Sequence, residues 1–167
     1  MPANTPPAND PILERVAQFL VDLINGINAE QIANGGFYFS GYQATRPHPS
    51  LDLSAIVDQR VQVVQGLGEL SEEASSTCSL VTREYFTFRA DAVVAQRGTD
   101  SLDRKLNLIR ADLIKRVMKD RQLGGIALTT DFAYAEIDDE VSDLWQGRVD
   151  IVFIITLQQS WLDPTTF

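Results

Sequence analysis

Apolar residues recur at three- and four-residue spacing in two long segments of the chain, as expected for helices with one buried face. In the first segment these positions are Ile12, Val16, Phe19, Leu20, Leu23, Ile24 and Ile27. Asp10 is expected to cap this helix, Pro11 to occupy its first turn, and Gly35-Gly36 to follow its end. The pattern therefore predicts an amphipathic helix between Asp10 and Gly35.

The second helical segment has its apolar stripe at Leu102, Leu106, Ile109, Leu113 and Val117, widened by Ile114 and Met118. Either Thr99 or Asp100 is expected to cap this helix, because both side chains can accept from the first free backbone N–H groups. Gly124-Gly125 are expected to end it.

Strands are predicted where apolar, β-branched and aromatic residues cluster or alternate with polar ones. The expected strands cover residues 37–42, 61–64, 80–95, 128–134 and 149–157. The third spans up to 16 residues and is expected to bend or bulge partway. The last carries apolar residues on both faces, so it belongs in the middle of a sheet or against a neighbouring subunit.

This order of elements predicts an α+β fold: a mainly antiparallel, mixed sheet with two main helices packed on one face and a closing β-hairpin. Residues 1–9 are rich in Pro and Asn and are expected to form a flexible arm. Residues 10–160 are expected to form a single domain, and residues 161–167 a C-terminal tail.

The composition favours a soluble protein made in a cytoplasm. Of the 167 residues, 44% are apolar and 22% charged, which is close to the average for globular domains. No apolar run reaches the roughly 20 residues of a membrane-spanning helix. Residues 1–9 lack Lys and Arg, so they do not form a secretory signal. The net charge of −9 argues against tight binding to nucleic acid.

The charges are unevenly distributed along the chain. Residues 100–121 hold half of the basic side chains, whereas residues 131–163 hold eight acids and a single base, Arg148. Two interpretations remain open: each cluster is an ordinary solvated face, or a basic helix face meets an acidic end of a neighbouring subunit.

The residues that catalysis or metal binding would need are scarce. Cys78 and His48 are the only residues of their types, which excludes an internal disulfide, a cysteine-based zinc site and a convincing Cys–His pair. Gly66-Leu67-Gly68 lacks the third glycine of a dinucleotide-binding loop, and no Gly-x-Ser-x-Gly occurs. We therefore expect neither an enzyme nor a bound cofactor.

An acidic stretch between the last two strands and an aromatic residue near the end of the chain are candidates for contacts with partners. The acidic stretch does not have the ligand spacing of a calcium loop, so it is either a solvated hairpin tip or a tip that faces a partner or a channel. Trp161 either anchors a neighbouring subunit or folds back on its own core. The acidic residues are Glu136, Asp138, Asp139, Glu140 and Asp143.

Two segments, SLDRKLNLIRADLIKRVMKDRQLGGIAL (residues 101–128) and QGRVDIVFIITL (residues 146–157), resemble the tail terminator (tail-tube-capping, tail completion) proteins of tailed bacteriophages. The resemblance implies a virion subunit, assembled in the host cytoplasm, that forms a hexameric ring on the head-proximal end of the tail tube. Such a ring stops tube growth and joins the tail to the neck. The implied partners are further copies of the chain, the tail tube protein and a neck or head-completion protein.

In such a ring DNA would pass through the lumen without specific binding, and the acidic residues from Glu136 to Asp143 would face that lumen or the next ring. Arg104, Lys105, Arg110 and Arg148 would contact neighbouring subunits or the tube. Two other functions remain open: a head-completion or neck connector ring, and a small-molecule-binding domain with a pocket between helices and sheet.

Overall fold

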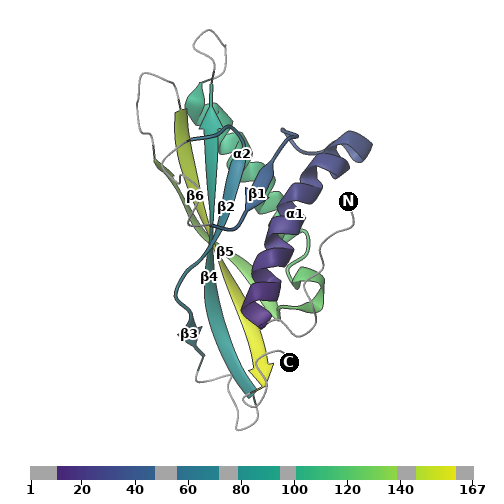
Figure 1. Ribbon diagram of the computed structural model, residues 1–167, viewed down its shortest axis with the longest axis vertical. Helices are drawn as coiled ribbons and strands as arrows, with labels where there is room; N and C mark the ends of the chain where they lie inside the picture. Colours follow the sequence, from purple (N-terminus) through teal and green to yellow (C-terminus); the bar gives the residue numbers. More distant parts are fainter. Residues whose placement is uncertain (1–10, 48–55, 72–78, 95–100, 139–145, 161–167) are drawn as a thin grey trace.

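The computed structural model describes residues 11–47, 56–71, 79–94, 101–138 and 146–160, which form two α-helices on one six-stranded sheet (Figure 1). The fold is the expected α+β arrangement. The elements are, in chain order, α1 (Ile12–Asn34), β1 (Gln43–Thr45), β2 (Arg60–Gln65), β3 (Glu69–Leu70), β4 (Ser79–Val93), α2 (Leu102–Met118), the 3-10 turn η1 (Leu123–Gly125), β5 (Thr129–Asp138) and β6 (Gln146–Ser160).

The sheet is built around two long antiparallel strands, β4 and β6, which pair without interruption from Ser79↔Ser160 to Val93↔Gln146. The strand order is β1-β2-β4-β6-β5, and β3 pairs with the beginning of β4. Only β1 and β2 are parallel to each other. β6 therefore lies inside the sheet, as its two apolar faces predict.

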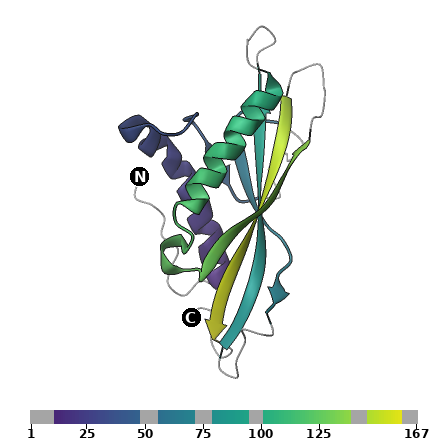
Figure 2. The same cartoon turned by 180° about the vertical axis from the view of Figure 1, so that it is seen from behind.

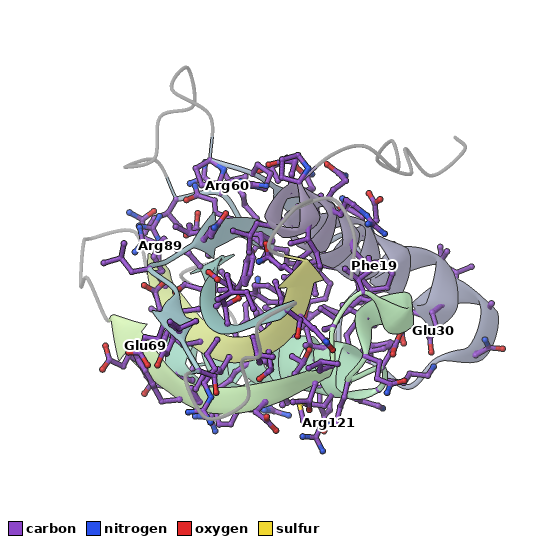
Figure 3. The ribbon with its side chains drawn as sticks, turned by 90° about the horizontal axis from the view of Figure 1, so that it is seen from below. Phe19, Glu30, Arg60, Glu69, Arg89 and Arg121 are labelled. Carbon is purple, nitrogen blue, oxygen red and sulfur yellow. The ribbon has the colours of Figure 1, made fainter. Side chains whose placement is uncertain are left out.

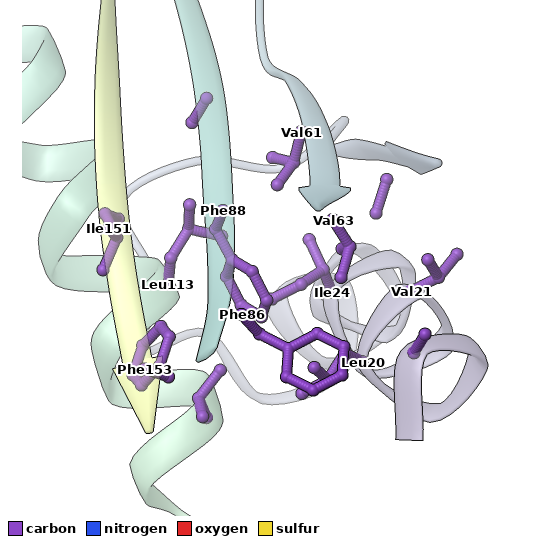
Figure 4. Packing of buried hydrophobic residues seen from close by; sticks show 14 of the residues in the cluster. Leu20, Val21, Ile24, Val61, Val63, Phe86, Phe88, Leu113, Ile151 and Phe153 are labelled. Atoms are coloured by element: carbon purple, nitrogen blue, oxygen red, sulfur yellow. The ribbon is translucent and has the colours of Figure 1, made fainter. Parts of the chain in front are cut away.

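Both helices cover the same face of the sheet, as Figures 1 and 2 show from opposite sides. Alternate residues of the strands point to this face, and they form one buried cluster with the apolar stripes of both helices (Figure 4). In this cluster the Phe88 and Phe153 rings lie 5.1 Å apart, centroid to centroid. Losing either aromatic side chain would cost about 3–5 kcal/mol.

The first helix begins one residue later than the capping pattern predicts. Pro11 occupies the N-cap position, and its carbonyl accepts from the backbone N–H groups of Glu14 and Arg15. Pro11 is therefore not in the first turn, and Asp10 lies outside the described residues. The predicted end is confirmed, because the helix stops at Asn34 and Gly35 follows with φ of 67°.

The second helix is shorter than predicted at its C-terminal end. Its N-cap is Ser101, whose hydroxyl accepts from Arg104 N, rather than Thr99 or Asp100, which lie outside the described residues. The helix ends at Met118, well before Gly124-Gly125. Between them the Asp120 carboxylate accepts from Gln122 N and Gly124 N, and so builds a turn that no apolar periodicity would reveal.

Residues 37–42 do not form the predicted strand, because their backbone donors bind side chains of the two helices. The Asp112 carboxylate of α2, which is 1% exposed, accepts from Tyr38 N at 2.9 Å and from Phe39 N at 3.0 Å. It also accepts from the Tyr42 hydroxyl at 2.9 Å. Asn28 of α1 accepts from Tyr42 N. A buried carboxylate thus replaces the neighbouring strand that a sheet would supply.

The third strand has no bulge against its neighbour, since β4 keeps a continuous register with β6. The irregularity lies in β5 instead, where Ala133 is an extra residue between Phe132 and Tyr134. β5 also continues to Asp138, so Glu136 and Asp138 belong to the strand and not to the loop after it.

We predict that Tyr42 makes the stability of the fold sensitive to alkaline pH. Burial first, and then the negative charge of Asp112, raises the pKa of Tyr42 above its ordinary value of 10.0. A raised pKa means that the folded state favours the protonated phenol. The contribution of Tyr42 to the free energy of unfolding is therefore complete below about pH 10 and is progressively lost as the pH rises above it.

The test is denaturant unfolding of the wild type and of Tyr42→Phe. At pH 7 the variant should lose about 1–2 kcal/mol of unfolding free energy, because its ring cannot donate to Asp112. At pH 11 the difference in unfolding free energy between the wild type and the variant should be smaller. An equal difference at both pH values would contradict a raised pKa of Tyr42.

Candidate interaction surface at the edge of the sheet

The two edges of the sheet differ in length and in what covers them. One edge is β1, only three residues long, and the other is β5, with ten. Among the described residues no strand pairs with the outer side of β5. An uncovered strand of this length presents unpaired backbone N–H and C=O groups to any partner.

The β1 edge is closed by the first helix. Asn25 of α1 accepts from Ala44 N at 2.8 Å and donates to Ala44 O at 3.1 Å, so its amide takes the place of a neighbouring strand. Asn28 does the same for the residues just before β1, accepting from Gly41 N and donating to Tyr42 O. Pairing with another chain is therefore blocked at this edge.

The β5 edge, in contrast, exposes large apolar side chains. Phe132 is 41% exposed, Tyr134 52% and Ile137 36%, and Leu128 just before the strand is 49% exposed. Phe132 packs edge-on against Phe153 of the core, with ring centroids 6.1 Å apart. These side chains are half-exposed because an edge strand has a neighbour on one side only, and aromatic residues placed in this way are typical of interface cores.

The beginning of β5 is fastened by a basic residue from the turn after α2. Arg121 Nε donates to Thr130 O at 3.0 Å, and its Nη2 contacts the side chains of Thr129 and Asp131. The bulge at Ala133 follows immediately. The free part of the edge is therefore residues 132–138.

A group of charged residues lies on the face of the sheet opposite the helices. The Asp91 carboxylate, 1% exposed, accepts from Arg60 Nη2 at 2.7 Å and from Arg148 Nε at 2.7 Å. It joins three strands, β2, β4 and β6. We call Arg60, Asp91 and Arg148 the Asp91 cluster.

A second ion pair follows along the same face, where Arg89 of β4 lies opposite Asp150 of β6 and the two side chains meet at 3.1 Å. The hydrogen bond to Asp150 raises the pKa of the Arg89 guanidinium. In Figure 3 Arg60 and Arg89 lie on one side of the molecule, and Glu30 of α1 lies on the other. The charged side chains of this face are therefore paired within the chain, and the same face also carries the apolar residues Val64, Val152 and Ile154.

The basic residues of α2 are mostly used inside the chain. Lys105 pairs with Asp58 at 2.8 Å, and Lys119 donates to Glu30 at 2.6 Å. Arg116 also contacts Glu30, so these contacts tie α2 to α1, and the hydrogen bond from Lys119 lowers the pKa of Glu30. Lys115 donates to the carbonyl of Gly36.

Of the four basic residues predicted to touch partners, Arg104 is exposed and Arg110 half-buried on α2. Lys105 and Arg148 instead make the intrachain ion pairs just described, with Asp58 and Asp91. Contacts of all four with another subunit or with the tube stay predictions.

The predicted acidic residues fall partly outside the described part of the chain. Glu136 is exposed on β5, and Asp138 ends that strand opposite Arg148. Asp139, Glu140, Asp143 and Trp161 lie outside the described residues. Of the predicted acidic residues, the described ones therefore belong to β5.

Two buried carboxylates and the free edge were not found from the sequence. Asp112 lies near Arg110, Lys115 and Arg116, so it resembles a solvated residue of a charged helix face. Asp91 lies between Ala90 and Ala92 in an alternating strand, where one face is expected to be solvated. The one available signal for Asp112 is its place between Ile109 and Leu113 on the apolar stripe of α2.

Among the described residues, no three His, Cys, Asp or Glu side chains gather closely enough to hold a metal ion. Neither α1 nor α2, the helices of the described residues, is long and apolar enough to cross a membrane. A scan against models of known protein families and a search of curated protein sequences find no match to this chain.

We predict that Asp91→Asn lowers the unfolding free energy by about 3–5 kcal/mol, because two arginines lose the charge that holds them against the sheet. The matched control is Asp150→Asn, which breaks a half-exposed pair and should cost about 1 kcal/mol or less. Urea denaturation of both variants measures the difference, and equal losses would contradict a special role for Asp91.

Proposed function

We propose that this protein is a structural subunit of a tailed-bacteriophage virion, of the tail terminator type. Copies of the chain form a hexameric ring on the head-proximal end of the tail tube. The ring stops tube polymerisation and joins the tail to the neck.

The observation that carries this proposal is the uncovered β5 edge with its half-exposed Phe132, Tyr134 and Ile137. A sheet that closes one edge with Asn25 and leaves the other bare is suited to attaching something beyond its own chain. The two segments that resemble tail terminators contain α2 and most of β6, the elements that flank β5 in the fold.

The charges fit a closed ring, in which each subunit meets its two neighbours through unlike surfaces. Arg104 and Arg110 are on α2, whereas Asp131 and Glu136 are on β5. Arg104 and Arg110, together with Lys105 and Arg148, are expected to contact the neighbouring subunit or the tube. Glu136 and the acidic residues after it are expected to face either the next ring or the lumen, where negative charge would let DNA slide without sticking.

The direct test is electron microscopy of gold-labelled protein mixed with purified tail tubes and, separately, with portal-bearing heads from the same phage. Label confined to one end of each tube is the expected result. Label on the heads and at neither tube end would instead indicate a neck connector and contradict the tail terminator proposal.

A pair of variants tests whether β5 takes part. Tyr134→Lys places a charge at a 52% exposed position of the free edge, and Ile32→Lys places the same charge at an 84% exposed position of α1. We expect the first variant to lose most of the end label and the second to keep it. Loss of label in both, or in neither, would remove β5 from the contact.

A further inference from the structure

The free part of β5 carries different chemistry on its two sides. Its register with β6 places Phe132 and Ile137 on the side of the sheet that the helices cover. The same register places Asp131, Tyr134 and Glu136 on the opposite side, the side of the Asp91 cluster. The strand thus has an apolar row and an acidic row, separated by the plane of its backbone.

An additional strand beside β5 would meet both rows at once. Its backbone would pair with the outward N–H and C=O groups, and its alternate side chains would lie next to those of β5. Apolar side chains would cover Phe132 and Ile137, which now have a cross-strand neighbour only in β6. The side chains between them would lie beside Asp131 and Glu136.

The acidic row lacks a compensating charge at Glu136. Glu136 lies directly opposite Asp150 in the register with β6, and Asp150 already forms an ion pair with Arg89. No base pairs with Glu136 among the described residues, whereas Asp131 is held by Arg121. Like charges opposite each other destabilise a sheet, so a cation supplied beside Glu136 from outside would relieve the repulsion.

A second copy of the chain does not supply that cation. Every side chain of β5 that is charged at neutral pH, in the sequence TTDFAYAEID, is acidic, so two copies paired through this strand would set acids beside acids. The β1 edge of another copy is closed by Asn25. The bulge at Ala133 further discourages pairing with an identical strand. Neither described sheet edge of a second copy therefore fits β5, and we take the partner to be a different protein.

We propose that the β5 edge accepts, as an additional strand, an extended segment of another protein in which basic and apolar residues alternate. This deepens the proposed function by naming the chemistry of the partner, and it rests on that function only in taking the partner to be a component of the same assembly.

The test uses the full chain and a synthetic peptide as long as β5, in which lysine and valine alternate. Fluorescence anisotropy of the labelled peptide measures binding, and amide hydrogen exchange of the chain shows where the peptide binds. We expect binding that slows exchange in residues 129–138 and weakens as salt is added, since the charges are exposed. Three control peptides carry glutamate in place of lysine, the same residues scrambled, or methyl groups on alternate backbone nitrogens, and we expect all three to bind at least tenfold more weakly.

Matched variants of the chain locate the charge. Glu136→Gln should weaken binding about threefold, which is the usual effect of one exposed ion pair. Asp22→Asn removes the same charge from α1, which packs against β1 and β2 at the other end of the strand order, and should leave binding unchanged. Equal effects of the two variants would mean a general attraction to an acidic protein and would overturn the proposal.

Two further results would also overturn it: binding of the methylated or scrambled peptide as tightly as the alternating one, or self-association of the chain that protects residues 129–138 without any peptide. Failure of peptide binding together with end label on tail tubes would reject this inference and keep the proposed function. Peptide binding without end label on tail tubes would keep this inference and reject the proposed function.

Discussion

The uninterrupted pairing of β4 with β6 is the interaction on which the rest of the structure depends. Because the two strands keep one register over their whole length, Phe86 and Phe88 of β4 reach the same face as their partners in β6, Phe153 and Ile151. That face holds the core with α1 and α2. The same register brings Asp91 to Arg148 and Arg89 to Asp150 on the other face. A slip of one residue would bury these charges and expose Phe86, Phe88 and their partners.

The central pair also determines what the two edges can do. On the β2 side the sheet ends with β1. The outward backbone groups of β1 at Ala44 are bound by the Asn25 side chain, so this edge has no free groups there for a further strand. The β6 side is completed by β5 alone, which leaves Phe132 and Tyr134 half-covered. The closed edge limits growth of the sheet to one direction. An assembly subunit needs such a limit, because two open edges would favour uncontrolled strand addition.

Much of the fold could be predicted from local patterns. The stripes from Ile12 to Ile27 and from Leu102 to Val117 gave both helices, and the two apolar faces of β6 placed it inside the sheet. What could not be predicted depends on contacts between distant residues. Residues 37–42 read as a strand because they are aromatic, but their hydrogen-bond partner, Asp112, lies more than 70 residues further along the chain.

The candidate site was predicted less well than the fold, for the same reason. Alternation along β5 looks the same in an edge strand and in a central strand, so only the strand order reveals that this edge is bare. Arg148 reads as a surface base, yet its register sets it beside Asp91. The acidic end predicted from the charge along the sequence lies mostly outside the described residues, and Glu136 is its exposed residue on β5.

The central claim, that β5 is the surface through which this protein joins an assembly, is tested most directly by hydrogen exchange of the chain alone and bound to purified tail tubes. We predict that amides in residues 129–138 exchange more slowly in the bound state. Residues 43–45, closed in both states, should not change. Unchanged exchange in β5, with slower exchange confined to α2 or to the face around Asp91, would contradict the claim.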